Sequence, residues 1–193
     1  MTMKIKKFFI LFLILACSYF LHAENGYNLW LRYNKIEDKN ILKYYNERIK
    51  EVFFIDVTGI EKTAKNDLRM ALSIILDRNI NFTHKISSNV LVVGRYENLP
   101  ELIKKSIDTL KLKKLGEEGY LIESINFRNK NIVITSINDK GILYGVFHFI
   151  RLILMNENID DLNIVEVPAI KYRILNHWDN LNRTVERGYA GFS

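Results

Sequence analysis

The strongest constraint on the fold is the alternation of strand-like and helix-like segments between residues 27 and 156. Runs rich in β-branched and aromatic residues predict strands over residues 27–33, 52–57, 89–94, 119–125 and 131–135. Helical patterns cover residues 36–50, 68–76, 99–112 and 141–153. Strands that alternate with helices of this length indicate a sheet with helices packed on it. We therefore predict an α/β fold with a mixed, α+β-like sheet.

Three of the predicted helices have a face that should be buried, whereas the helix over residues 36–50 is polar. In the second helix, residues at i, i+3, i+4, i+7 and i+8 lie on one side, namely Leu68, Ala71, Leu72, Ile75 and Leu76. In the last helix, the corresponding residues are Ile142, Val146, Phe149, Ile150 and Ile153. Over residues 99–112 we expect a buried face of Ile103, Ile107 and Leu110 and solvated lysines at positions 104, 105, 111, 113 and 114.

The two strands over residues 119–125 and 131–135 resemble a hairpin with Asn129 and Lys130 at the turn. Asn and Asp then cluster over residues 156–163, which we interpret as the connection out of the first domain. Beyond it, the alternation of Ile170, Tyr172 and Ile174 predicts another strand.

The first 23 residues have the composition of a targeting signal. Lys4, Lys6 and Lys7 precede an apolar run from residue 8 to residue 17, which is shorter than the ~20 residues of a membrane span. Cleavage after Ala23 is one interpretation. A second is lipidation of Cys17 at a lipobox-like sequence, and a third is an uncleaved anchor. We expect the protein to be exported, as a periplasmic protein, an extracellular protein or a lipoprotein. Contact with the membrane is expected only through this segment.

Composition excludes several classes of function. Half of the net charge of +6 comes from the three signal lysines, and the remaining basic residues are scattered, so nucleic-acid binding is not expected. Cys17 is the single cysteine, which leaves no disulfide. His22, His84 and His148 lack metal-ligand spacing, and we expect His148 to be a packed helical residue. We predict neither a metal nor a cofactor.

A polar and aromatic cluster follows the strand at residues 170–174. It contains Trp178, Asp179 and Asn180, whose flat indole and paired donors and acceptors suit a sugar ring and its hydroxyls. A structural Trp in a loop cap is the alternative. Composition alone does not decide between these two interpretations.

Three segments resemble glycoside hydrolase family 67. They are GYNLWLRY at residues 26–33, GILYGVFHFIR at residues 141–151, and RILNHWDNLNRTVERGYAG at residues 173–191. The second is also similar to a helix in the non-catalytic domain that precedes hexosaminidase barrels. The resemblance implies a signal peptide over residues 1–23, a hexosaminidase-domain-2-like α/β domain over residues 24–160, and the start of a truncated (β/α)₈ barrel over residues 165–193.

That family consists of inverting α-glucuronidases, which release α-1,2-linked (4-O-methyl)glucuronic acid from xylooligosaccharides in xylan breakdown. The resemblance implies a substrate-binding role for Trp178, Asp179 and Asn180 at the carboxyl end of the first barrel strand. Glu186 and Arg187 would frame the uronic acid, with Arg187 able to bind a carboxylate in bidentate fashion. The alternative for these two residues is an ion pair that orders the loop.

The family's catalytic acid and base come from later barrel strands, and a barrel needs ~250 residues. We therefore expect no catalytic residue in this chain, an inactive fragment, and weak packing after Ile170. A non-catalytic exported carbohydrate-binding or accessory module is the alternative function.

Overall fold

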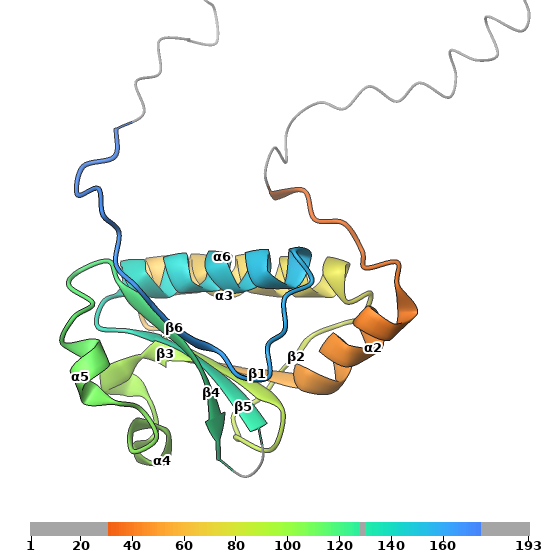
Figure 1. Cartoon of the computed structure of the whole chain (residues 1–193), viewed down its shortest axis with the longest axis horizontal. Helices are drawn as coiled ribbons and strands as arrows, with labels where there is room; N and C mark the ends of the chain where they lie inside the picture. The colour runs from red at the N-terminus through yellow and green to blue at the C-terminus, as the bar shows by residue number, and fades with distance from the viewer. Residues whose placement is uncertain (1–30, 128–129, 175–193) are drawn as a thin grey trace, which may run out of the picture.

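A computed structural model describes residues 31–127 and 130–174, which form one mixed six-stranded sheet with helices on both faces (Figure 1). The strand order is β2-β1-β3-β5-β4-β6. The strands are β1 Glu51–Phe54, β2 Asn81–Phe82, β3 Val90–Arg95, β4 Tyr120–Asn126, β5 Lys130–Ser136 and β6 Asn163–Glu166. β2, β1, β3 and β5 run parallel to one another, whereas β4 is antiparallel to both β5 and β6. The predicted mixed α/β sheet is confirmed.

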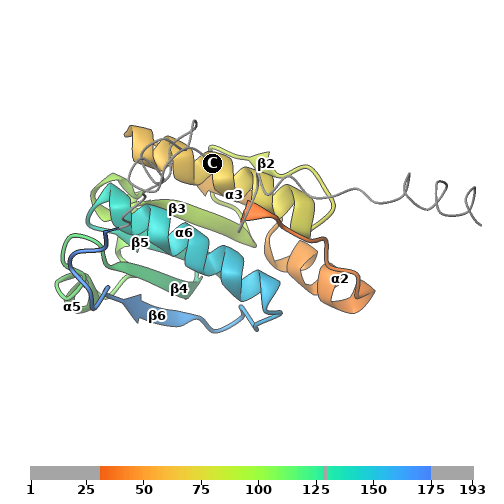
Figure 2. The ribbon, with the colours of Figure 1, turned by 90° about the horizontal axis from the view of Figure 1, so that it is seen from above.

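Two long helices cover one face of the sheet, and two single-turn helices lie on the other (Figure 1). The long helices are α3 Gly59–Ile75 and α6 Asp139–Leu154. The short ones are α4 Glu101–Lys104 and α5 Thr109–Leu112. Helix α2, Lys39–Arg48, and the segment that follows β6 lie at opposite ends of the sheet (Figure 2). The chain therefore leaves the sheet far from α2.

The predicted faces of the two long helices are buried in one hydrophobic core. In α3, the residues with at most 1% exposure include Leu68, Ala71, Leu72, Ile75 and the capping residue Leu76. In α6, the five predicted residues are exposed by 2% or less. A second core, on the opposite face, includes Val92, Ile103, Leu115, Leu121 and Val133. Burial of apolar area on both faces stabilises the layered arrangement.

Side-chain caps mark the starts of α2 and α3. The Asp38 side chain accepts from the backbone N–H groups of Asn40 and Ile41, so α2 starts three residues later than Ile36, the predicted first residue. At α3, Thr58 and Glu61 form a reciprocal capping box. These side chains satisfy N–H groups that have no partner within the helix.

The strand predicted over residues 27–33 is wrong where the structure describes it. Residues 27–30 lie outside the described part, and Leu31 to Tyr33 are not in a strand. Tyr33 is instead buried against the core, and the Ile36 N–H donates to the Ile75 carbonyl at the end of α3. Tyr33, the aromatic residue of this run that the structure describes, therefore packs against the core and does not pair in a strand.

The continuous helix predicted over residues 99–112 is also wrong, because the chain breaks into α4 and α5. The Asp108 side chain accepts from the Leu110 N–H and caps the start of α5. Ile103 and Ile107 are buried as predicted, but Leu110 is 63% exposed. Lys111, predicted to be solvated, donates to Glu123 at 2.5 Å and has a side chain only 24% exposed.

The predicted hairpin is confirmed as β4 and β5. Asn129 lies outside the described residues, and Lys130 begins β5 opposite Asn126 rather than occupying the turn. The sheet continues past residue 160, where we expected the first domain to end, because β6 pairs with β4.

Residues 170–174 do not form the predicted strand in the structure. Ile170, Tyr172 and Ile174 are 65%, 76% and 87% exposed, as expected for a weakly packed segment. Within the described ranges, none of the helices has the length and apolar character needed to cross a bilayer.

Candidate functional site

The side chains predicted to bind sugar lie outside the described residues. This holds for Trp178, Asp179, Asn180, Glu186 and Arg187, and also for Cys17. Their roles stay predictions. The structure does describe the residues that lead into the cluster, up to Ile174.

Arg173, the first residue of the 173–191 motif, binds side chains of the folded domain. One guanidinium nitrogen of Arg173 donates to Glu118 at 2.5 Å and to the Tyr144 hydroxyl at 3.2 Å. The guanidinium also lies 5.4 Å from the centre of the Tyr144 ring. Lys140 is 3.9 Å from the other oxygen of Glu118. The motif therefore begins at a fixed point beside the first turns of α6.

Close backbone packing brings Glu118 and Tyr144 together. The Ser136 hydroxyl at the end of β5 donates to the Gly119 carbonyl at 2.6 Å. A Cβ atom at Gly141 would lie 2.1 Å from Ser136 Oγ and 2.3 Å from the Gly119 carbonyl oxygen. Only glycine at position 141 lets α6 approach the start of β4 this closely.

The ion pair with Glu118 raises the pKa of Arg173, mainly through the side-chain hydrogen bond. Arginine is charged throughout the physiological range in any case. The carboxylate of Glu118 is the more enclosed partner, with a side chain 22% exposed against 41% for Arg173. The pair is thus a charge-assisted anchor at the surface, sensitive to salt.

A second group of charges lies where β3 ends. Arg95 Nε donates to Glu61 at 2.9 Å, and another nitrogen of Arg95 lies 2.6 Å from Glu97. The Glu61 side chain is completely buried, and its other oxygen accepts from the backbone N–H groups of Val57 and Thr58. Each carboxylate oxygen of Glu61 has a hydrogen-bond partner. We therefore interpret the contacts of Glu61 with Arg95 and the backbone as structural, holding β3 against α3.

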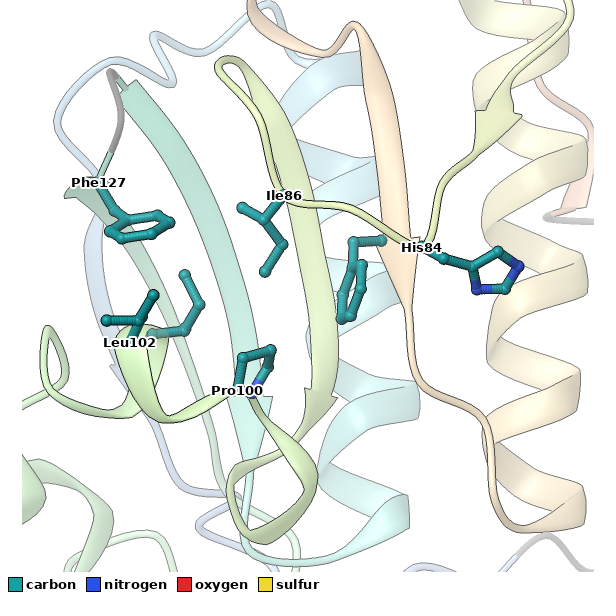
Figure 3. A pocket seen from close by; sticks show the side chains of 7 residues that line it. His84, Ile86, Pro100, Leu102 and Phe127 are labelled. Atoms are coloured by element: carbon teal, nitrogen blue, oxygen red, sulfur yellow. The ribbon is translucent and has the colours of Figure 1, made fainter.

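An apolar pocket of about 220 Å³ opens on the face that carries α4 (Figure 3). Its lining comprises Phe53, His84, Ile86, Pro100, Leu102, Ile103 and Phe127. The His84 imidazole points away from the other labelled side chains (Figure 3). This pocket can bury an apolar group, but it presents no carboxylate for acid–base chemistry.

His148 is a packed residue, as predicted. Its Nδ1 lies 2.9 Å from the Tyr120 hydroxyl, and the two rings meet edge to face. Burial lowers the pKa of His148, and Arg151 lowers it further, while Glu166 opposes them. Across residues 31–127 and 130–174, no cluster of three or more His, Cys, Asp or Glu side chains could hold a metal ion.

Comparison with protein families identifies the family of this chain. The model of the glycosyl hydrolase family 67 N-terminus matches residues 29–149, and that of the family 67 middle domain matches residues 152–193. The chain belongs to glycosyl hydrolase family 67. This confirms the resemblance carried by the three sequence segments. In this family 67 chain, the boundary between the two matches falls inside α6, so β6 lies in the part matched by the middle domain.

Curated relatives of the family 67 chain are named α-glucuronidases. A probable α-glucuronidase A of Aspergillus oryzae is 27% identical over 172 residues, which cover 88% of this chain and 20% of the relative. An α-glucuronidase A of Aspergillus tubingensis is 29% identical over 176 residues, covering 89% and 20%. The family 67 chain therefore spans about one fifth of the length of these relatives.

Among solved structures, the family 67 chain is similar to BtGH115A, a family GH115 4-O-methyl-α-glucuronidase with specificity for decorated arabinogalactans. The TM-score is 0.46 at 16% identity, over 64% of this chain and 18% of that chain.

No pattern in the sequence pointed to a role for Glu118 or Tyr144. Glu118 belongs to none of the quoted segments and lies 55 positions before Arg173, whereas Tyr144 lies in the segment at residues 141–151 but was given no role there. The only signal was Arg173 itself, a cation at the head of the family 67 motif. An arginine in that position favours a nearby carboxylate, but the sequence does not say which one.

Proposed function

We propose that this chain takes part in α-glucuronidase activity, in which α-1,2-linked (4-O-methyl)glucuronic acid is removed from xylooligosaccharides during xylan breakdown. The observation that carries the proposal is the match to the family 67 middle domain over residues 152–193. This match contains the polar and aromatic cluster, and the curated relatives named above are α-glucuronidases.

Sugar binding would depend on a small number of side chains. The Trp178 indole stacks on the apolar face of a sugar ring, while Asp179 and Asn180 bind hydroxyl groups. Arg187 binds the uronic acid carboxylate with two parallel hydrogen bonds, and Glu186 orients Arg187. In the proposal, these residues lie at the carboxyl end of the first strand of a (β/α)₈ barrel, after a hexosaminidase-like domain.

Hydrolysis with inversion needs two carboxyl groups about 6.5–9.5 Å apart, on opposite faces of the sugar. We assign neither role to a residue of this chain. The proposal is therefore that these 193 residues contribute substrate contacts and do not hydrolyse the substrate by themselves. Export through residues 1–23, with cleavage after Ala23 or a lipid on Cys17, would place the protein where xylooligosaccharides occur.

The two tryptophans of the chain provide a direct test of sugar binding. In the variant Trp30→Phe, Trp178 is the sole indole, so its fluorescence reports on its own surroundings. We expect a saturable fluorescence change when 4-O-methylglucuronosyl xylotriose is added, and a much smaller change with plain xylotriose. The Trp178→Phe variant, which keeps Trp30, should show no saturable change and should bind at least about tenfold more weakly in calorimetry, or about 1.4 kcal/mol.

A saturable change of equal size in Trp178→Phe would contradict the assignment of Trp178. Hydrolysis is tested separately, by measuring release of 4-O-methylglucuronic acid from the same oligosaccharide. We expect none from this chain alone. Release by the chain alone would show that it carries the acid and base that we do not assign to it.

A further inference from the structure

β6 is the outermost strand at one edge of the sheet, and within the described residues it pairs only with β4 (Figure 2). Natural proteins commonly block such an edge with lysine, proline or a bulge, because its free backbone groups can pair with another chain. Residues 163–167 have the sequence NIVEV, without a lysine or a proline. Val165 and Val167 are also 36% and 48% exposed. We call residues 163–167 the β6 edge, which is open to pairing.

The hydrogen bonds to β4 show which backbone groups of the β6 edge point outward. The Ser124 N–H donates to the Leu162 carbonyl at 2.8 Å, and the register makes these two residues cross-strand partners. In an antiparallel ladder, hydrogen-bonded pairs of this kind alternate with pairs whose backbone groups face the other way. The N–H and C=O groups of Asn163 and Val165 therefore point away from β4. They are the groups that a further strand would use.

Two copies of the β6 edge complement each other. In an antiparallel alignment centred on Val165 of both copies, Asn163 lies opposite Val167, which continues the same alternation. Each hydrogen-bonded pair exchanges two bonds, so this alignment supplies up to about six backbone hydrogen bonds. Val165 lies opposite Leu121 and so on the face that carries α5, where its side chain would contact the same side chain of the second copy. The contact is isologous, as in a two-fold homodimer.

The same alignment brings opposite charges together on the face that carries α6. Glu166 points to this face, because it lies opposite Tyr120, whose hydroxyl contacts His148. In the pair, Glu166 lies across from Ile164 of the second copy. α6 runs antiparallel to β6, so Arg151, about one turn beyond His148, lies toward the start of β6, where Ile164 is (Figure 2).

Arg151 and Glu166 are suited to an ion pair between copies. Both are exposed, and among the described residues neither forms an ion pair within its own chain. Both act on the His148 ring, whose pKa is lowered by burial and by Arg151 and raised by Glu166. The two charges therefore lie near one ring, at the side of the sheet that ends in β6. Two-fold symmetry would make the pair of Glu166 with Arg151 of the other copy twice.

We propose that the β6 edge is a self-association surface, through which two copies of this chain join their sheets into one continuous sheet. Val165 pairs with Val165 of the second copy, and Glu166 of each copy forms an ion pair with Arg151 of the other. A second copy is the partner that fits, because the edge complements itself in both backbone groups and charge. The contact involves one short strand per copy, so the dimer is weak and reversible, with a dissociation constant on the order of 10 μM.

Sedimentation velocity of the full chain, from about 1 to about 100 μM, tests the dimer. Arg151→Glu and Glu166→Arg should each weaken dimerisation by at least about tenfold, because each sets like charges against one another across the contact. An equimolar mixture of these two variants should form dimers again, since each variant supplies the charge opposite to that of the other. Lys62→Glu, an equal change of charge at an exposed position of α3, is the matched control and should leave the dimer unchanged.

A second variant tests the backbone pairing. Val165→Pro removes an N–H that points away from β4, so the β4 ladder is kept, as circular dichroism should confirm, while the dimer should be lost.

Three results would overturn the proposal. The first is a chain that stays monomeric at every concentration. The second is a dimer or larger assembly that tolerates both charge reversals or a folded Val165→Pro chain, since association would then use another surface. The third is a mixture of the two charge-reversal variants that remains monomeric, or an effect of Lys62→Glu equal to that of Arg151→Glu.

Discussion

Arg95 at the end of β3 donates through Nε to Glu61 in the first turn of α3, at 2.9 Å, and the Glu61 side chain has no exposed surface. This contact joins the sheet to the helix layer at the carboxyl end of β3. Because one partner is completely buried, this ion pair should contribute more to stability than the other ion pairs among the described residues, whose partners are all partly exposed.

Removing Arg95 should destabilise the fold. Arg95→Met leaves the carboxylate of Glu61 buried without its cation, and losses of this kind cost about 3 kcal/mol or more. Urea unfolding followed by circular dichroism measures the change. Lys62→Met, an exposed position in the same helix, is the control and should shift stability by less than about 0.5 kcal/mol. Equal stability of the two variants would show that Glu61 does not depend on Arg95.

A methyl group at position 141 should disrupt the contact between α6 and the hairpin. The new Cβ in Gly141→Ala would meet Ser136 Oγ at 2.1 Å and the Gly119 carbonyl at 2.3 Å. We expect a loss of about 3 kcal/mol in the free energy of unfolding, because overpacking outweighs the better helix propensity of alanine. In Gly59→Ala, the new Cβ meets nothing within 4 Å, so this control should be neutral or slightly stabilising. A neutral Gly141→Ala would refute the close approach.

The anchor at Arg173 should protect the segment that follows β6 from trypsin. Replacing Glu118 by Gln removes the charge on the acceptor, and cleavage after Lys171 and Arg173 should then accelerate several-fold. The adjacent substitution Glu117→Gln should leave the rate unchanged. High salt should speed cleavage of the unsubstituted chain and have little further effect on Glu118→Gln. Identical cleavage rates in both variants would mean that the ion pair does not restrain the segment.

Stability should depend on the protonation of His148. Burial lowers the pKa of His148 in the folded chain below 6.5, the value expected when the chain is unfolded. The unfolded state therefore binds the proton more readily, and folding stability falls as pH decreases. The contribution is complete above about pH 6.5 and is lost as pH falls through the lower folded-state pKa.

Urea unfolding at about pH 8 and about pH 5 tests this dependence. His148→Gln, which keeps a donor and an acceptor for the Tyr120 hydroxyl, should lose less stability on acidification than the unsubstituted chain. His84→Gln, at an exposed position, should behave like the unsubstituted chain. The prediction fails if the pH dependence is the same with glutamine at position 148.

Periodic patterns in the sequence predicted the central elements well. The α3 face that includes Leu68 and Leu72 is fully buried, and the pairing of β4 with β5 is as expected. In both places, the hydrophobic period and the local structure agree. The break at Asp108 was not predicted, because a capping side chain decided the local conformation against a continuing apolar pattern.

The surroundings of the candidate site could not be predicted, because they depend on contacts between residues far apart in the sequence. Arg173 and Glu118 meet only because β4, β5 and α6 bring the Glu118 loop next to the end of the described chain. No local pattern encodes such a pair. Trp178, Asp179 and Asn180 were predicted from their chemistry and their resemblance to family 67, and their roles await the sugar titration.

The position of β6 has a consequence for synthesis on the ribosome. This strand pairs with β4 and completes the sheet. It follows β4 by some forty residues in the chain and is synthesised only after α6. Until residue 166 has left the exit tunnel, the nascent chain presents the backbone of β4 as an open edge able to pair with other chains. A boundary drawn at the end of α6 would leave that edge open permanently, so expression of the domain should extend through Glu166.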